Sequence, residues 1–217
     1  AIGSASKMEC HFGNGKRHRA FSVLLFDKND RLLVQRRSLE KITFPGVWAN
    51  TCCSHPLDNP NENSDPIEGV IAAAKRKLEQ ELGIDASTVT GWDFKHIGSF
   101  EYSCRWDVDW IEHEIDHVLV VRSNADPRPN PNEISEVRWI DPLELKEMVE
   151  GGGNWHNQDV APWFKMIWKH FLSLSHPLVP KSQNVEPIIR CGELQMRTIA
   201  IPGQSLLDAL SSHREIV

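Results

Sequence analysis

Residues 65–83 read Asp-Pro-Ile-Glu-Gly-Val-Ile-Ala-Ala-Ala-Lys-Arg-Lys-Leu-Glu-Gln-Glu-Leu-Gly, and this stretch decides the fold. Asp65 is a good N-cap, Pro66 suits the first helical position, and Glu68 completes a box-like pair with the cap. Gly83 supplies the stop. Apolar residues recur at steps of three and four, which predicts a helix with one buried stripe: Ile67, Val70, Ile71, Ala74, Leu78 and Leu82.

Apolar runs on both sides of this helix predict strands. Ala20–Phe26 and Arg31–Gln35 flank the polar turn Asp27–Asp30, which is typical of a β-hairpin. Beyond the helix, residues 112–122 end in an unbroken apolar run that predicts a buried strand. Residues 136–140 predict another strand.

Further helices are predicted toward the end of the chain. One runs from Pro142 to Val149 and stops at a glycine run, and a last one starts near Pro162. Residues 59–66 form a predicted polar loop, and a short helix is expected from Ser205 to Leu210. Strands mixed with two or three helices around one core indicate an α/β or α+β fold.

Composition narrows the class of protein. The chain has 217 residues, 40% of them hydrophobic and 25% charged, which fits one globular domain or one domain plus an appendage. No apolar run reaches the roughly 18 residues that span a bilayer, and no signal segment opens the chain. The net charge of −6 argues against a generic nucleic-acid binder.

The expected compartment is the cytoplasm. Five scattered cysteines favour reduced thiols over a secreted disulfide framework, and the last residues are not a peroxisomal signal. The sequence opens without Met, so an organellar targeting segment upstream stays open as an alternative.

Two short patterns offer metal ligands. In an extended segment, residues two apart project to the same side, which pairs Cys53 with His55 and Glu112 with Glu114. Imidazoles with carboxylates suit Mn²⁺, Fe²⁺ or Zn²⁺. The alternative is ordinary polar packing and a solvated acid pair, and spacing alone does not decide between them. Two imidazoles upstream of the first strand can join the group: His11 and His18.

Residues 113–117 match the H-E-x-x-H pattern of zinc proteases, which works only on a helix. Here the pattern leads directly into the apolar run of a predicted strand. On a strand, His113 and His117 would lie about 13 Å apart, at ~3.3 Å per residue. We therefore reject the protease interpretation.

The C-terminal half of the central helix resembles a degenerate Nudix box, the glutamate-rich helix that holds Mg²⁺ against a diphosphate. Glu68 and Arg76 fall at box positions, whereas Lys77 and Gln80 replace glutamates of the hydrolytic members. By this resemblance Glu81 can still serve one Mg²⁺. Without the resemblance, the default interpretation is an amphipathic helix with a charged outer face.

Taken together, the segments resemble type 1 isopentenyl-diphosphate isomerase, a family with the Nudix fold. The resemblance covers about three quarters of the chain, from Lys7 to Phe171, and rests on motifs such as Thr-Cys-Cys-Ser-His-Pro (51–56) and Glu-His-Glu (112–114). It implies a Nudix-like α/β/α sandwich with a mixed sheet as residues 1–172. Residues 173–217 would be a C-terminal extension of unknown role.

The resemblance also implies a reaction and its residues. The family converts isopentenyl diphosphate into dimethylallyl diphosphate by protonation to a carbocation and deprotonation, so an acid and a base must flank the substrate. Cys53 would serve one face of the substrate, Glu114 with Tyr102 would serve the other, and Trp163 would lie against the cation. One divalent metal, Mn²⁺ or Zn²⁺, would be held by His11, His18, His55, Glu112 and Glu114.

The diphosphate end has its own implied residues. Cationic side chains are expected around a polyanion, and the positions that match the family are Lys7, Arg37, Lys41 and Lys77. Glu81 would hold Mg²⁺ that bridges to the diphosphate. The implied partner is a small-molecule diphosphate substrate, and neither nucleic acid nor a membrane is expected as a partner. The protein is expected to be a monomer.

Two other functions compete with this interpretation. A Nudix hydrolase would cleave the diphosphate, although the replaced box glutamates count against it. A non-catalytic protein could hold a structural zinc through Cys52, Cys53 and His55, although adjacent cysteines fit the usual ligand spacing poorly.

Overall fold

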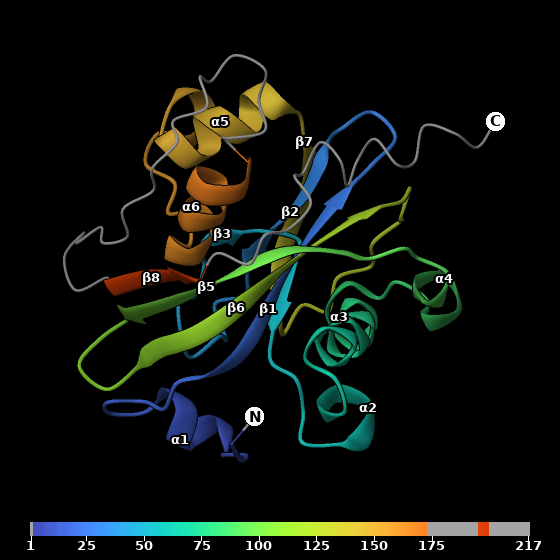
Figure 1. Ribbon diagram of the computed structural model, residues 1–217. Coiled ribbons are helices and arrows are strands. Elements are labelled where there is room, and N and C mark those ends of the chain that lie inside the picture. Colours follow the sequence, from blue (N-terminus) through green and yellow to red (C-terminus); the bar gives the residue numbers. More distant parts are fainter. Residues whose placement is uncertain (1, 173–194, 200–217) are drawn as a thin grey trace.

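The computed structural model describes residues 2–172 and 195–199, and within them eight strands form one sheet (Figure 1). The strands are β1 (His18–Phe26), β2 (Leu32–Arg37), β3 (Trp48–Ala49), β4 (Cys52–Ser54), β5 (Lys95–Arg105), β6 (Ile111–Arg122), β7 (Ile134–Ile140) and β8 (Gln195–Ile199). Their order is β3-β2-β1-β6-β5-β8, with β4 paired to β1 and β7 paired to β2. The β1–β6 pair is parallel and β5–β6 is antiparallel, so the sheet is mixed as predicted.

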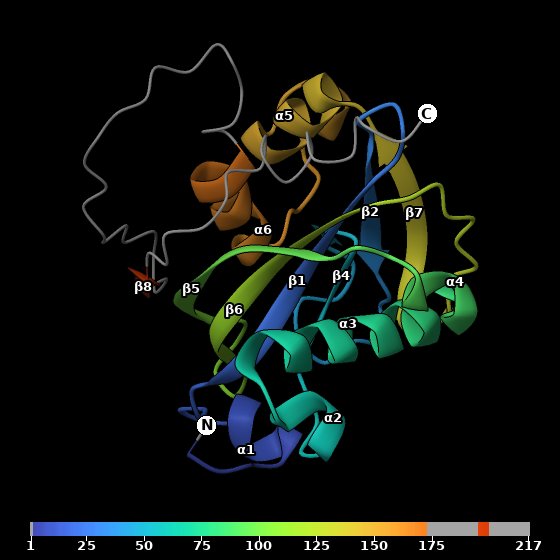
Figure 2. The same ribbon diagram turned by 45° about the vertical axis from the view of Figure 1, so that its right-hand side comes forward.

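Helices cover both faces of the sheet. They are α1 (Lys7–His11), α2 (Pro60–Asn63), α3 (Pro66–Leu82), α4 (Ala86–Thr90), α5 (Pro142–Glu150) and α6 (Pro162–Ile167). Figure 2 shows α3 and α4 on one side of the strands and α5 and α6 on the other. Each side has its own buried apolar cluster. The predicted α/β/α sandwich is therefore confirmed.

The central helix α3 forms where the sequence predicts it. The Asp65 carboxylate accepts hydrogen bonds from the backbone N–H groups of Ile67 and Glu68, and Gly83 ends the helix at φ 60°. Most of the predicted stripe is buried, whereas Ile67 and Ile71 lie half-buried at its edge. The buried face of the helix packs against the sheet. Because successive side chains of a strand point to opposite faces, every second residue of β1 points toward the helix.

The predicted strands are also present. β1 and β2 form the predicted antiparallel hairpin, with Phe26 opposite Leu32. β6 and β7 include the two later predicted strands. Alternate residues of β1 enter different clusters, since Val23 faces the α3 side and Leu24 faces the α5–α6 side. Because side chains alternate between the two faces of a strand, β1 contributes residues to both apolar clusters.

Some elements differ from the predictions. Residues 60–63 form the short helix α2 within the predicted loop, because the Asn59 side chain caps it. Helix α1 and strand β5 were not predicted. The last helix changes to a π-helical turn at Trp168–Leu172, and a 3₁₀ turn (Gly153–Trp155) precedes it. The predicted helix at 205–210 lies outside the described residues.

Part of the C-terminal extension joins the sheet. β8 pairs antiparallel with β5, with Glu101 opposite Arg197. The boundary at residue 172 and the role of the extension stay predictions. No helix of the described residues is long and apolar enough to cross a membrane.

Candidate functional site

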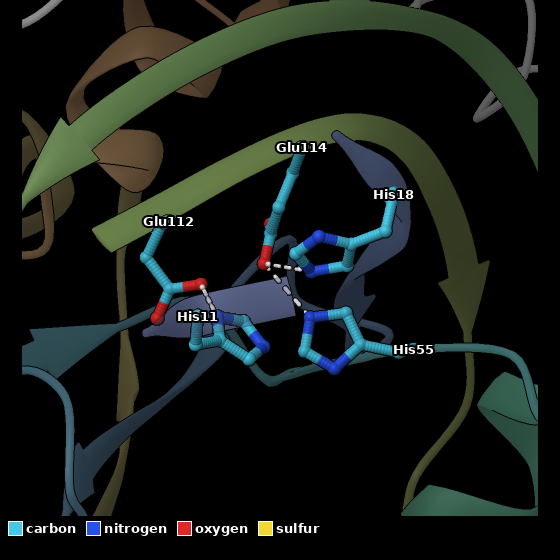
Figure 3. A group of neighbouring side chains, drawn as sticks. All are labelled: His11, His18, His55, Glu112 and Glu114. Carbon is cyan, nitrogen blue, oxygen red and sulfur yellow. Dashed lines mark hydrogen bonds and ion pairs between the residues drawn. The ribbon is translucent and has the colours of Figure 1, made fainter. Parts of the chain in front are cut away.

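Three imidazoles and two carboxylates meet at one end of the sheet (Figure 3). His11 ends α1, His18 begins β1, and His55 follows β4. Glu112 and Glu114 come from the same face of β6. One potential ligand atom from each of the five lies within 4.8 Å of the others. The structure therefore brings together all five residues that the resemblance assigned to a metal.

Sheet topology explains why these residues meet. The parallel pairing of β1 with β6 places His18 directly opposite Glu114. The antiparallel pairing of β1 with β4 brings Cys53 opposite Ser22, and His55 continues just beyond this strand. β1 thus pairs with both β4, which precedes His55, and β6, which carries Glu114. Sequence spacing could not show that these two segments lie close together.

Direct contacts join the imidazoles to the carboxylates. His55 Nε2 lies 2.8 Å from Glu114 Oε1, and His18 Nε2 lies 3.6 Å from the same oxygen. His11 Nδ1 is 3.2 Å from Glu112 Oε2. The Nε2 atoms of His11 and His18 are buried without a hydrogen-bond partner. Because buried polar atoms are normally satisfied, these two nitrogens are candidates to coordinate a metal ion.

The pKa shifts in this group follow from burial and pairing. Burial opposes ionisation of Glu114, but the neighbouring imidazoles of His18 and His55 outweigh it and hold the pKa of Glu114 well below its usual value. Burial disfavours the charged form of His18, yet the Glu114 carboxylate raises the pKa of His18 above its usual value. An anionic carboxylate is therefore favoured at the centre of the imidazoles.

The five residues fit a divalent transition metal. Imidazole and carboxylate donors suit Mn²⁺, Fe²⁺ or Zn²⁺, and two orphaned imidazole nitrogens are ready to coordinate. Backbone Ile111 O lies 3.2 Å from His11 Nδ1, which leaves Nε2 as the free donor of that ring.

Four of the five metal-ligand candidates line a pocket: His11, His55, Glu112 and Glu114. Cys53, Tyr102 and Trp163 line the same pocket, together with the cationic residues Lys7, Arg37, Lys41 and Lys77. The structure thus brings the predicted acid–base residues, the aromatic residue and the four cations to one place. Of the predicted site residues, His18 and Glu81 do not line it.

Cys53 faces the pocket as a neutral thiol. Burial raises the pKa of Cys53 to about 12, although nearby Arg37 opposes this shift. Arg37 Nη1 lies 3.9 Å from Cys53 Sγ. At neutral pH the residue therefore carries a proton, which a general acid requires.

Tyr102 and Glu114 form a hydrogen-bonded pair in the pocket. The Tyr102 hydroxyl donates to Glu114 Oε2 at 2.7 Å, and the tyrosine is 2% exposed. Burial, followed by the charge of Glu114, raises the pKa of Tyr102 well above its usual value. The hydroxyl thus stays protonated as a donor to the carboxylate.

Asn50 and Arg37 hold the indole of Trp163. Its Nε1–H donates to Asn50 Oδ1 at 3.1 Å, and the Asn50 amide donates to backbone Val23 O and Cys52 O. The Arg37 guanidinium lies 5.5 Å from the centre of the indole ring. The Arg37 guanidinium therefore makes a cation–π contact with the buried Trp163 ring, as expected for an electron-rich aromatic surface.

The lysines of the pocket surround a carboxylate that sequence reasoning missed. Glu133 precedes β7 and forms an ion pair with Lys41, while Lys77 Nζ lies 3.9 Å from Glu133 Oε1. Burial opposes ionisation of Glu133, but the bond with Lys41 lowers its pKa. Burial and the charge of Lys41 lower the pKa of Lys7.

Glu81 lies beside Lys77 and is not one of the five clustered metal-ligand candidates. Its side chain is buried, 2.9 Å from Lys77 Nζ through Oε1. The Cys52 thiol donates to Oε2 at 3.6 Å. Since Mg²⁺ prefers carboxylates together with substrate phosphate oxygens, Glu81 suits Mg²⁺ only in company with a phosphate.

The geometry excludes two alternative metal sites. His113 and His117 lie on β6, where His113 contacts Glu101 and His117 contacts His96, so the rejection of a zinc-protease motif is confirmed. Cys52 and Cys53 enter opposite faces of the sheet, because adjacent strand residues alternate. They do not share a zinc with His55.

Three more polar residues of the pocket region were missed. The Ser22 hydroxyl donates to Asp116 Oδ2 at 2.8 Å, and Asp116 Oδ1 is buried without a partner. Asn50 holds Trp163 from a turn between β3 and β4. Asp116 had a signal, since it continues the alternation of Glu112 and Glu114; nothing local marked the other two.

Comparison with known proteins agrees with this geometry. The NUDIX domain family matches residues 16–164. The chain is 43% identical to the isopentenyl-diphosphate delta-isomerase of Aspergillus fumigatus over 79% of this chain and 66% of that protein. The Bos taurus isopentenyl-diphosphate delta-isomerase 1 is also 43% identical, over 79% of this chain and 77% of its own length.

The chain belongs to the isopentenyl-diphosphate isomerases of the NUDIX family. The isomerase of Schizosaccharomyces pombe is 41% identical over 77% of this chain and 75% of that protein. The chain thus spans about two thirds to three quarters of the length of these relatives. Identity of this level over so much of an isomerase sequence confirms the family that the motifs indicated.

Solved structures share the fold at low identity. A NUDIX hydrolase from Alicyclobacillus acidocaldarius matches with a TM-score of 0.53 and 13% identity, over 71% of this chain and 90% of that chain. The MutT protein from Methanosarcina mazei matches with a TM-score of 0.50 and 17% identity, over 70% and 91%. These similarities confirm the Nudix-like fold of the chain.

Proposed function

We propose that this chain isomerises isopentenyl diphosphate to dimethylallyl diphosphate, in isoprenoid biosynthesis. The main support is a single pocket that combines a neutral thiol, a tyrosine–carboxylate pair, an indole and a group of cations. Family membership supports the same reaction. The rest of this proposal concerns what each residue does.

Two groups move protons at the alkene. A proton is added to the terminal CH₂ carbon, which leaves a tertiary cation, and a proton is then lost from the carbon on the other side. Cys53 serves one face of the substrate, and Glu114 with Tyr102 serves the other. Their starting protonation suits both roles, because the thiol pKa is about 12 and the pKa of Glu114 is held low.

Trp163 stabilises the cation between the two proton-transfer groups. An aromatic face attracts positive charge by about 0.5–2 kcal/mol, more when water is excluded. The hydrogen bond from its Nε1–H to Asn50 fixes the plane of the indole. Asn50 is therefore a positioning residue for Trp163.

The five-residue group holds one divalent metal, which we propose is Mn²⁺ or Zn²⁺. Bound there, a metal supplies positive charge beside Glu114 and fixes the orientation of that carboxylate. His11, His18 and His55 would hold it from three different segments, so folding of the N-terminal part preorganises the base.

The diphosphate lies against Lys7, Arg37, Lys41 and Lys77. Cationic donors in a partly buried pocket bind a polyanion strongly. Glu81 would hold Mg²⁺ together with the diphosphate, because this ion uses one or two carboxylates together with phosphate oxygens. The hydrocarbon end then points toward Trp163 and Cys53.

Isomerisation is tested by NMR in deuterated water. The purified protein, loaded with Mn²⁺ and supplied with Mg²⁺, is incubated with isopentenyl diphosphate, beside Cys53→Ala and the control Cys104→Ser. We expect deuterium-labelled dimethylallyl diphosphate from the wild type and the control, and none above background from Cys53→Ala. Circular dichroism checks that all three proteins are folded.

Other outcomes separate the alternatives. Release of inorganic phosphate or pyrophosphate would instead identify a Nudix hydrolase. That outcome is disfavoured here because Lys77 and Gln80 replace glutamates of the hydrolytic members, and Gln80 is exposed outside the pocket lining. A folded, metal-loaded protein that leaves the substrate unchanged would contradict the proposed reaction.

A cytoplasmic monomer is the proposed form of the enzyme. Every residue assigned above comes from one chain, and the Cys53 thiol must stay reduced, as it does in the cytoplasm. One relative, from Arabidopsis thaliana, is named as chloroplastic. Sedimentation of the protein and the location of a fluorescent fusion test both points.

A further inference from the structure

Glu133 lies beside three of the four cations that the proposed function assigns to the diphosphate: Lys7, Lys41 and Lys77. It pairs with Lys41, it lies 3.9 Å from Lys77 Nζ, and its charge also acts on Lys7. Each of these lysines lines the pocket, and Glu133 lines it as well. An anionic ligand entering the pocket must therefore meet this carboxylate.

The loop carrying Glu133 is anchored rather than free. Backbone Ser38 N–H donates to Glu133 O at 2.9 Å, and Glu133 N–H donates to Asn130 O. Backbone Asn130 N–H in turn donates to Glu81 O. These bonds tie the loop to α3, so the backbone of Glu133 is held beside the lysines.

Lys77 links Glu133 to Glu81. Its Nζ lies 2.9 Å from Glu81 Oε1 and 3.9 Å from Glu133 Oε1. Burial disfavours the charged form of Lys77, but Glu81 raises its pKa, so the ammonium group is retained. Two carboxylates thus share one cation at the edge of the pocket.

This charge pattern disfavours a bare polyanion. A free diphosphate would gain the lysines but would lose their bonds to Glu133 and approach its negative charge. A diphosphate carrying Mg²⁺ brings two compensating positive charges, and Mg²⁺ itself favours carboxylate oxygens. The same carboxylate therefore repels one form of the ligand and attracts the other.

We propose that Glu133 is a specificity-determining residue that makes the lysine cluster select a Mg²⁺-complexed diphosphate over the free diphosphate. Glu133 acts as a second carboxylate beside Glu81, and it holds Lys41 until the complexed ligand arrives. This inference rests on the proposed diphosphate substrate, but it does not depend on the isomerisation chemistry.

The test measures binding of inorganic pyrophosphate by calorimetry, with Mg²⁺ present and with Mg²⁺ removed by a chelator. For the wild type we expect tighter binding with Mg²⁺. In Glu133→Gln the lysines lose their internal competitor, so the Kd for Mg²⁺-free pyrophosphate should fall about tenfold. The Kd with Mg²⁺ should stay the same or rise, which reduces the selectivity at least tenfold.

Two further variants are matched to this change. Glu136→Gln removes the same charge three residues away, where Glu136 pairs with Arg138 outside the pocket. Glu133→Asp keeps the charge and should keep selection for the Mg²⁺ complex. The chelator affects the His/Glu group equally in all four proteins, so comparison among them isolates the lysine cluster.

The outcomes distinguish this inference from the proposed function. Equal selectivity in Glu133→Gln and Glu136→Gln would overturn the role of Glu133 and leave the proposed substrate intact. The same holds if the wild type binds pyrophosphate with the same Kd with and without Mg²⁺. A wild type that binds no pyrophosphate in either condition would overturn the diphosphate substrate too. Mg²⁺-selective binding without isomerisation would contradict only the proposed reaction.

Discussion

The Glu62–Arg76 ion pair should stabilise the fold around His55, and Glu62→Gln tests this. Arg76 Nε lies 2.8 Å from Glu62 Oε1, and Arg76 Nη2 lies 2.9 Å from Oε2. Backbone Leu57 N–H donates to the same carboxylate at 2.8 Å. Arg76 Nη2 also donates to His55 O at 3.2 Å, so the pair supports a segment that carries a metal-ligand candidate.

The expected loss follows from burial and charge. The Glu62 and Arg76 side chains are 6% and 24% exposed. A hydrogen bond to a charged group contributes about 1.5–3 kcal/mol, and glutamine keeps some of the contacts. We therefore expect Glu62→Gln to lower the free energy of unfolding at pH 7 by about 2 kcal/mol.

The loss should depend on pH. Burial raises the pKa of Glu62, but bonds from Arg76 and Leu57 outweigh it and leave the pKa lowered from 4.5. A folded-state pKa below the unfolded value means that the ionised group stabilises the fold above the unfolded pKa. This contribution declines as pH falls below the unfolded pKa of about 4.3 and is lost through the folded pKa, so the difference between the two proteins should shrink in this range.

Urea unfolding at pH 7, 5 and 3.5 measures the effect. Glu136→Gln is the control, because its pair with Arg138 is exposed and should contribute less than ~0.5 kcal/mol at any pH. The reasoning is refuted if Glu62→Gln loses no more stability than the control. It is also refuted if the loss stays constant down to pH 3.5.

Three other predictions concern the site and its scaffold. His18→Ala should lower the bound Mn²⁺ or Zn²⁺ per chain after dialysis, measured by mass spectrometry of the metal, because it removes one of five clustered ligands; unchanged content would exclude His18. Tyr102→Phe should lower kcat at least about tenfold while Tm stays nearly constant, since only the donor to Glu114 is lost; unchanged kcat would contradict this. Gly69→Ala should lower the free energy of unfolding by about 1–3 kcal/mol, measured in urea, because its Cβ would lie 2.3 Å from backbone Glu62 O; an equally stable variant would show that the α2–α3 contact can relax.

Local signals were sufficient for much of the fold. The helix α3 was predicted with its correct ends, because Asp65 and Gly83 satisfy its terminal backbone groups through nearby bonds. Short helices were not predictable in the same way. α1 and α2 have five and four residues, lengths at which a helix depends on packing rather than on its own propensity.

For the candidate site as well, some features could be predicted from the sequence and others depend on the tertiary structure. The motifs named the five metal-ligand candidates and the pocket residues through family resemblance. Only the tertiary structure placed His18 against Glu114, because the parallel β1–β6 pairing joins distant segments. It also revealed Asn50 behind Trp163 and Glu133 among the lysines.

By itself, the sequence determined the local elements and the chemical types of the site residues, since caps, turns and side-chain periodicity act over a few neighbouring positions. The tertiary structure decided which side chains meet, which face each cysteine enters, and how far each pKa shifts. Burial and charge neighbours set those properties, and both depend on segments that the folded sheet alone brings together.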